Sequence, residues 1–137
     1  LPCSFAMALH TSLDDFLNHL GHDGSAIVWP DLDEPRRRRA FHIQECIRVA
    51  YDHYGKSVTQ FEFSPVATAD GHRTYEIDHS DFVNHLMENG EGVLTGRGRS
   101  NFHAVCWRSQ MVYDPNGLIY QLPAPMMFTP NCFWRIA

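Results

Sequence analysis

The sequence predicts an α+β fold, with N-terminal helices packed on a C-terminal antiparallel sheet. In residues 1–54, apolar side chains recur at helical spacing, and glycines follow two of these periodic segments. After residue 90 the pattern changes to short β-prone segments separated by turn residues. Because the chain has 137 residues, 44% hydrophobic and 20% charged, we expect one globular domain over residues 1–137.

Two helices are expected before residue 22. Residues 3–10 are rich in Ala, Met and Leu, which are strong helix formers. A second helix begins after an N-cap at Thr11 or Ser12, and Gly21 is placed to end it. Its apolar face is spaced i, i+3, i+4 and i+7, and consists of Leu13, Phe16, Leu17 and Leu20.

The middle of the chain alternates between loops and regular elements. Residues 22–41 are rich in Asp, Gly and Pro and predict a loop, whereas residues 42–54 predict a helix that Gly55 ends. Residues 58–63 alternate like a strand, and residues 64–74 predict a loop.

A short helix is expected after Ser80, ending at Asn89 and Gly90. Its apolar positions are Phe82, Val83 and Leu86. The rest of the chain predicts strands with turn signals between them. These expected strands cover residues 92–96, 101–107, 110–113, 118–122 and 133–136.

Charge and hydropathy set the expected partners. The net charge of −5 argues against a nucleic-acid partner, because nucleic-acid binders usually carry a basic face. The four arginines at 36–39 are the exception, flanked by Asp31, Asp33 and Glu34. We expect a solvated loop in which these charges pair with each other, the alternative being a phosphate or RNA contact.

The apolar runs are shorter than the roughly 20 residues of a membrane helix, so no membrane partner is expected. The chain opens at Leu1 without an initiator methionine, and no signal-peptide pattern is visible. We therefore expect a cytoplasmic protein, or one delivered into a host cytoplasm, and allow that residues upstream of Leu1 belong to it.

The four cysteines do not predict disulfides or a zinc site. Their spacings match no compact disulfide framework, and the chain has no CxxC motif. His19-x-x-His22 and His42-x-x-x-Cys46 have ligand-like spacing, but Gly21 separates the first pair and Cys46 falls on an apolar helix face. We expect four reduced thiols, and neither a metal nor a cofactor.

Cys3 is the best candidate for a reactive thiol, because it lies at the predicted start of a helix. Free amides and the positive end of the helix dipole stabilise a thiolate there. The alternative is a small apolar residue in the core. Cys46, Cys106 and Cys132 are interpreted as structural, since they fall mid-helix, on a strand face opposite His103, and in a Pro-flanked tail.

His103 and Asp114 are candidates for the partners of such a thiol. In strand alternation His103 shares a face with Val105 and Trp107, where an unpaired polar group would be costly. Asp114 opens an Asp-Pro-Asn-Gly type I turn directly after the next strand, where its carboxylate can lie beside the histidine ring. Each residue alone also has a structural explanation, as a satisfied core histidine and a turn aspartate.

In order and setting, these residues resemble papain-like hydrolases, especially the compact C39-like peptidase group. That group has a cysteine at the head of the first helix, a histidine in a His-Ala-Val-like strand, and an Asp or Asn in an Asp-Pro-Asn-Gly-like turn. Cys3, His103-Ala104-Val105 and the turn from Asp114 match in that order, over nearly the whole chain.

The resemblance implies a papain-like fold and a Cys3–His103–Asp114 triad that cleaves an amide bond of a peptide or protein substrate through an acyl-enzyme. Glutamine deamidation or acyl transfer uses the same triad. The family usually has a Gln shortly before the cysteine, whereas Leu1 and Pro2 precede Cys3 here. A second hypothesis is therefore a binding or effector module of the same fold with little or no catalysis. Neither hypothesis predicts an oligomeric state.

Overall fold

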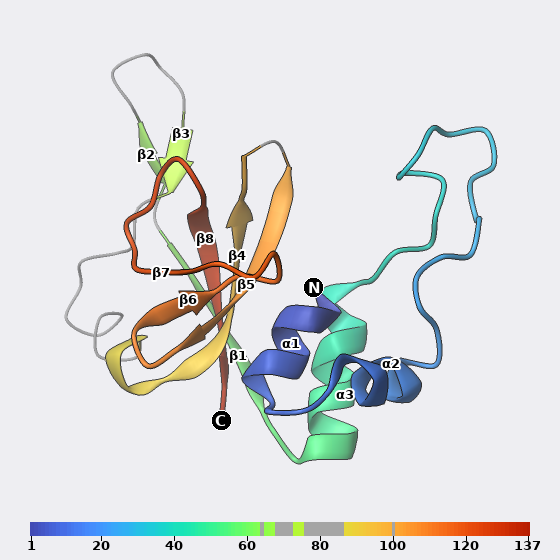
Figure 1. The fold of residues 1–137 in the computed structure, drawn as a ribbon, viewed down its shortest axis with the longest axis horizontal. Helices are drawn as coiled ribbons and strands as arrows, with labels where there is room; N and C mark the ends of the chain where they lie inside the picture. Colours follow the sequence, from blue (N-terminus) through green and yellow to red (C-terminus); the bar gives the residue numbers. More distant parts are fainter. Residues whose placement is uncertain (64, 68–72, 76–86, 100) are drawn as a thin grey trace.

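Helices precede an antiparallel sheet in the structure, a computed structural model that describes residues 1–63, 65–67, 73–75, 87–99 and 101–137 (Figure 1). The α+β class predicted from the sequence is confirmed. No described helix is both long enough and apolar enough to cross a membrane.

The first three helices begin and end close to the residues that the capping signals predicted. They are α1 (Pro2–Ala8), α2 (Leu13–Leu20) and α3 (Ile43–Tyr54). Ser12 caps α2, because its side chain accepts a hydrogen bond from the Asp15 amide at 3.1 Å. Gly21 and Gly55 end α2 and α3 in the left-handed conformation, with φ of 81° and 63°, which glycine adopts without steric strain.

The main sheet has six strands in the order β1-β8-β4-β5-β6-β7, and every neighbouring pair is antiparallel. The strands are β1 (Val58–Glu62), β4 (Glu91–Arg97), β5 (Phe102–Arg108), β6 (Met111–Tyr113), β7 (Ile119–Tyr120) and β8 (Thr129–Ile136). β5 lies inside the sheet between β4 and β6, so its backbone is held from both sides.

A second, two-stranded sheet lies within the segment predicted as a loop. β2 (Pro65–Ala67) pairs antiparallel with β3 (Arg73–Tyr75). The prediction of a loop over 64–74 is therefore wrong for these residues. Three-residue strands are too short to show an alternation of polar and apolar residues.

Only the end of the helix predicted after Ser80 can be compared with the structure. Residues 87–89 are helical and the helix stops before Gly90, as the Asn-Gly signal predicted. The predicted positions Phe82, Val83 and Leu86 lie outside the described residues.

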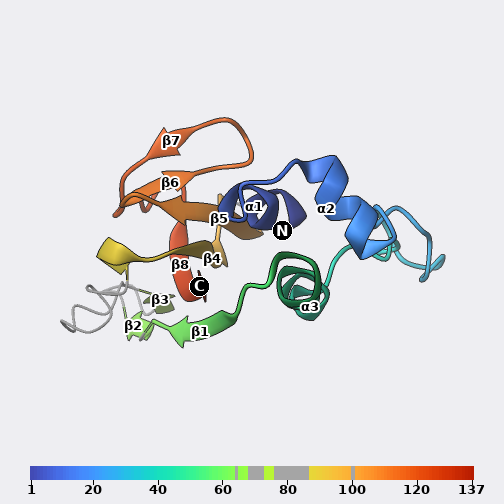
Figure 2. The same cartoon turned by 90° about the horizontal axis from the view of Figure 1, so that it is seen from below.

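The helices cover one face of the sheet (Figure 2). Ala104 and Cys106 of β5 pack on this face, in a buried cluster with helix residues. Val105 and Trp107 pack on the opposite face, in a second cluster. This division confirms the alternation expected for β5. The side chains from the helices in the first cluster are Phe5, Ala6, Ala8, Phe16, Cys46 and Val49.

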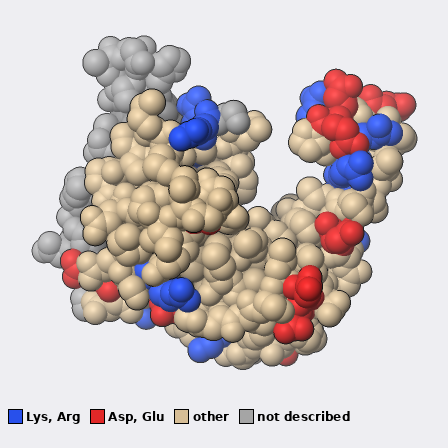
Figure 3. All heavy atoms as spheres, viewed as in Figure 1, with Lys and Arg blue, Asp and Glu red and all other residues tan. Residues whose placement is uncertain are grey.

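Residues 22–41 form a projecting segment between α2 and α3, and charges of both signs gather on it (Figure 3). All four arginines at 36–39 pair with carboxylates of Asp33, Glu34 or Glu45. The closest contacts are made by Arg38, whose Nε and Nη2 donate to the two Glu34 oxygens at 2.9 and 3.0 Å. The pairing with flanking acidic residues expected from the sequence is confirmed for Arg36, Arg37 and Arg38, whereas Arg39 pairs with Glu45 of α3.

The buried thiol of Cys46 leads to a prediction about stability. Cys46 is fully buried, and burial raises the pKa of its thiol to about 12. Cys46→Ser places a hydroxyl in an apolar cluster and is expected to lower the free energy of unfolding by about 1–3 kcal/mol. Urea denaturation measures this change. The control is Cys132→Ser at a half-buried position, with an expected change within about 0.5 kcal/mol. Equal effects would contradict the assignment of Cys46 to the core.

Candidate functional site

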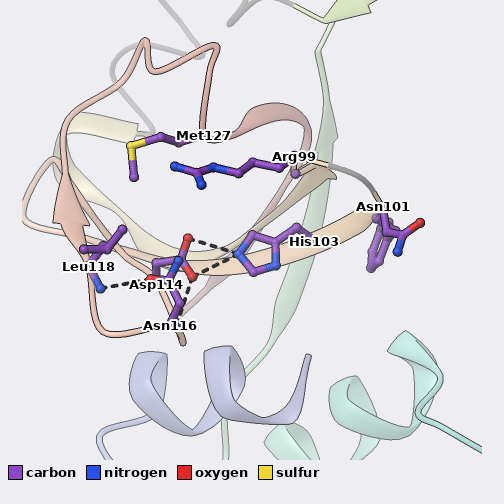
Figure 4. A pocket seen from close by; sticks show the side chains of 9 residues that line it. Arg99, Asn101, His103, Asp114, Asn116, Leu118 and Met127 are labelled. Carbon is purple, nitrogen blue, oxygen red and sulfur yellow. Dashed lines mark hydrogen bonds and ion pairs between the residues drawn. The ribbon is translucent and has the colours of Figure 1, made fainter. Parts of the chain in front are cut away.

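His103 and Asp114 form the centre of the candidate site (Figure 4). The His103 ring nitrogen Nε2 lies 3.0 Å from both carboxylate oxygens of Asp114. His103 is the second residue of β5, and Asp114 directly follows β6, the neighbouring strand. An ionised carboxylate only accepts hydrogen bonds, so Nε2 carries the proton and Nδ1 is left as the basic nitrogen. Nδ1 has no hydrogen-bond partner in the described part of the chain.

The turn after β6 fixes the Asp114 carboxylate. The Gly117 amide donates to the Asp114 carbonyl at 2.9 Å, which closes the predicted turn, and Gly117 has φ of 94°. The Asn116 amide donates to Asp114 Oδ1 at 3.1 Å, and the Tyr120 hydroxyl donates to Oδ2 at 2.9 Å. Asp114 is therefore held by groups from the turn, from β7 and from β5.

These donors determine the charge of Asp114. Its side chain is only 3% exposed, and burial by itself would raise the pKa of the carboxyl group. Hydrogen bonds from the Asn116 amide, His103 and Tyr120 outweigh burial, so the pKa of Asp114 lies below its usual value. Asp114 is consequently a carboxylate at neutral pH. In turn, burial and the hydrogen bond to Asp114 raise the pKa of Tyr120, which stays a hydroxyl donor.

A pocket of about 280 Å³ opens over this pair. His103 and Asp114 lie in its wall, and the other lining residues come from the β4–β5 turn, the turn after β6 and the segment before β8. The described lining residues besides the pair are Gly98, Arg99, Asn101, Phe102, Asn116, Leu118 and Met127. The Phe128 ring meets the His103 ring edge-on, with centroids 6.0 Å apart. The histidine is thus held in place while 32% of its side chain stays exposed.

Cys3 lies in the first turn of α1 and is half-buried. α1 lies beside β5 in both views of the fold (Figures 1 and 2). Besides apolar packing, a buried hydrogen bond joins them, in which Ser4 Oγ donates to the Ala104 carbonyl at 2.8 Å. Ser4 follows Cys3 and Ala104 follows His103, so this bond joins the neighbours of the two candidate residues.

The structure does not join Cys3 and His103 directly. No hydrogen bond connects their side chains in the described part of the chain, and Cys3 is not among the described residues that line the pocket. The chain thus brings two of the three predicted site residues into contact and carries the third, Cys3, on α1, which packs on the Ala104–Cys106 face of β5.

The other cysteines differ from Cys3 in their surroundings. Cys46 and Cys106 are fully buried, and burial raises the pKa of the Cys106 thiol to about 11. Cys132 is half-buried, and Gln60 Nε2 lies 3.5 Å from its sulfur. Cys132 belongs to β8, so the tail predicted around it is in fact a strand.

Sequence reasoning missed Ser4 and Tyr120 as supporting residues. Ser4 is fully buried within a helix, and its contact lies 100 residues away in the sequence. Tyr120 is six residues after Asp114, in the strand that returns from the turn. The alternation of 118–122 around a known turn was the available signal for Tyr120, whereas the sequence held no local signal for Ser4.

The predicted metal-ligand spacings do not correspond to a metal site in the described part of the chain. Among the described residues, no three His, Cys, Asp or Glu side chains come together in a way that could hold a metal ion. His22 instead pairs with Glu45 at 3.0 Å, and His19 stacks on His53.

Comparison of the chain with protein-family models, curated proteins and solved structures found no match.

Proposed function

We propose that this protein is a cysteine hydrolase of papain-like architecture, with Cys3 as nucleophile, His103 as general base and acid, and Asp114 as the residue that orients His103. The observation that carries the proposal is the His103 Nε2–Asp114 contact, which leaves Nδ1 free as a base. The packing of α1 on β5 through Ser4 and Ala104 also supports it, since Cys3 is thereby carried on the element next to His103.

The proposed reaction is hydrolysis of an amide bond in a peptide or protein. The Cys3 thiol gives its proton to His103 Nδ1, and the sulfur attacks the carbonyl carbon. The protonated imidazole then gives the proton to the leaving nitrogen as the C–N bond breaks, which leaves a thioester. Water, deprotonated by His103, attacks this thioester and restores the thiol. A glutamine side chain, or an acyl acceptor in place of water, fits the same steps.

A binding or effector module of the same architecture is the second candidate. It is favoured by one specific observation, the lack of a direct Cys3–His103 hydrogen bond among the described residues. Catalysis and simple binding differ in what they require of the thiol, because only catalysis needs a thiolate of high reactivity.

The rate of thiol alkylation separates the two candidates. With iodoacetamide at pH 6, Cys3 is expected to react before the other three cysteines, because His103 can take its proton and Cys46 and Cys106 are buried with raised pKa values. Peptide mapping by mass spectrometry after timed quenching gives the rate at each cysteine.

Cys132 is the internal control, since it is also half-buried but makes no contact with a histidine in the described part of the chain. In His103→Asn the rate at Cys3 is expected to fall to about that of Cys132. If Cys3 and Cys132 react equally fast in the unmodified chain, the nucleophile assignment fails and the binding module remains.

A further inference from the structure

We propose that Arg99 makes the site selective for substrates that carry a carboxylate beside the bond to be cleaved. The inference rests on the proposed function and names its substrate class. The pocket next to His103 contains one cationic side chain among its described lining residues, Arg99, and one carboxylate, Asp114. The net preference of the pocket depends on which of these two charges a ligand can reach.

Asp114 is not accessible to a ligand. Its carboxylate is 3% exposed and already accepts hydrogen bonds from the Asn116 amide, His103 and Tyr120. A buried carboxylate with its acceptor sites occupied has little capacity to bind a further cation. The negative charge of the pocket is therefore compensated from within the protein.

Arg99, by contrast, is exposed and has no ion pair or hydrogen bond in the described part of the chain. It differs in this from the arginines at 36–39, each of which pairs with a carboxylate. The remaining described lining residues, apart from His103, are neutral. The accessible charge of the pocket is thus positive, although the whole chain carries −5.

The position of Arg99 suits a substrate contact. It lies in the turn between β4 and β5, which the Gly98 amide closes by donating to the Asn101 carbonyl at 2.8 Å. Its side chain extends across the pocket above the His103–Asp114 pair, toward Met127 (Figure 4). A guanidinium group in this position can bind a carboxylate through two parallel hydrogen bonds. That carboxylate can be an acidic side chain or the free C-terminus of a peptide.

Binding can be tested without catalysis in the full chain carrying Cys3→Ala. The probes are acetylated pentapeptide amides of alanine with a central Glu, Gln or Lys, and a pentaalanine with a free C-terminal carboxylate. We expect the Glu peptide to bind about fivefold more tightly than the Gln peptide at low salt, and the advantage to shrink at high salt. Isothermal titration calorimetry measures the four dissociation constants. A preference for the free-carboxylate peptide over the Glu peptide would identify the C-terminus of a peptide as the carboxylate that Arg99 binds.

Arg97→Gln is the matched control for Arg99→Gln. Arg97 is exposed, lies two residues away in β4 and is not among the described residues that line the pocket. Arg99→Gln should abolish the preference for a carboxylate, Arg99→Lys should retain part of it, and Arg97→Gln should leave it unchanged.

Equal affinity for the Glu and Gln peptides, no measurable binding of any peptide, or equal losses in the two Gln variants would each overturn the role of Arg99. Activity without a carboxylate preference would refute this inference and leave the proposed hydrolase standing. A carboxylate preference that depends on Arg99, together with an unreactive Cys3, would support the role of Arg99 and refute the proposed hydrolase.

Discussion

Replacing Cys3 by alanine is expected to lower hydrolytic activity by roughly 10⁴-fold or more, since removal of a catalytic nucleophile has effects of this size. The measurement is the initial rate of cleavage of a fluorogenic amide or ester substrate by the full chain. Cys132→Ala is the matched control, because it removes another half-buried thiol and should leave the rate unchanged.

Stability decides how such a loss is interpreted. Cys3 lies in the first turn of α1 and is half-buried, so Cys3→Ala should lower the free energy of unfolding by less than about 1.5 kcal/mol. If Cys3→Ala unfolds the protein, or if activity persists in the folded variant, Cys3 is a structural residue and the proposed mechanism is wrong.

Asp114→Asn is expected to lower activity by roughly 10³-fold or more, because a neutral amide can hold His103 in the other tautomer, with the proton on Nδ1. The variant also loses hydrogen bonds to a buried charge, which should lower the free energy of unfolding by about 1.5–3 kcal/mol at neutral pH. Enzyme rates and urea denaturation at pH 7 measure the two effects.

The pH dependence of this stability difference follows from the lowered pKa of Asp114. Because the pKa is lower in the folded than in the unfolded chain, the unfolded chain binds more protons as the pH falls through this range. The contribution of Asp114 is fully present above its unfolded pKa of about 3.9 and is lost as the pH falls through its folded pKa. The difference in the free energy of unfolding between the unmodified chain and Asp114→Asn should therefore become smaller below about pH 4.

Tyr120→Phe provides a graded control for Asp114. It removes one of the donors to the carboxylate but keeps the charge and the His103 contact. The losses of activity and of the free energy of unfolding should therefore both be smaller than in Asp114→Asn. A loss of activity in Asp114→Asn no larger than in Tyr120→Phe would show that orientation of His103 by the charge is unimportant.

The helices could be predicted well because the residues that begin and end them act locally. Ser12, Gly21 and Gly55 each act within one turn of their own position. The last strand, β8, begins earlier than the sequence predicts, because Pro130 has no N–H group and argues against a strand. In the structure Pro130 lies opposite Gly96, beside a shift in the register of the β4–β8 pairing, where a strand can accommodate a proline.

The distinction between local signals and contacts that are distant in the sequence also explains how much of the site could be predicted. Asp114 follows the strand adjacent to that of His103, so a simple antiparallel pairing of β5 and β6 brings them together. The position of Cys3 relative to His103 depends on how a helix docks on a sheet. No local pattern specifies that docking, and Ser4, which contributes a buried hydrogen bond to it, appears in the sequence as an ordinary helix residue.

The bond between Ser4 and Ala104 also has a consequence for the order of folding. The His103–Asp114 contact closes a loop of 11 residues, whereas the Ser4–Ala104 bond closes one of 100. Closing the longer loop costs about 2 kcal/mol more conformational entropy, from the logarithmic dependence on loop length. We therefore expect His103 and Asp114 to come together early, within their own hairpin, and the Cys3 thiol to arrive late. Reactivity at Cys3 would then develop only in the last stage of folding, when α1 docks on β5.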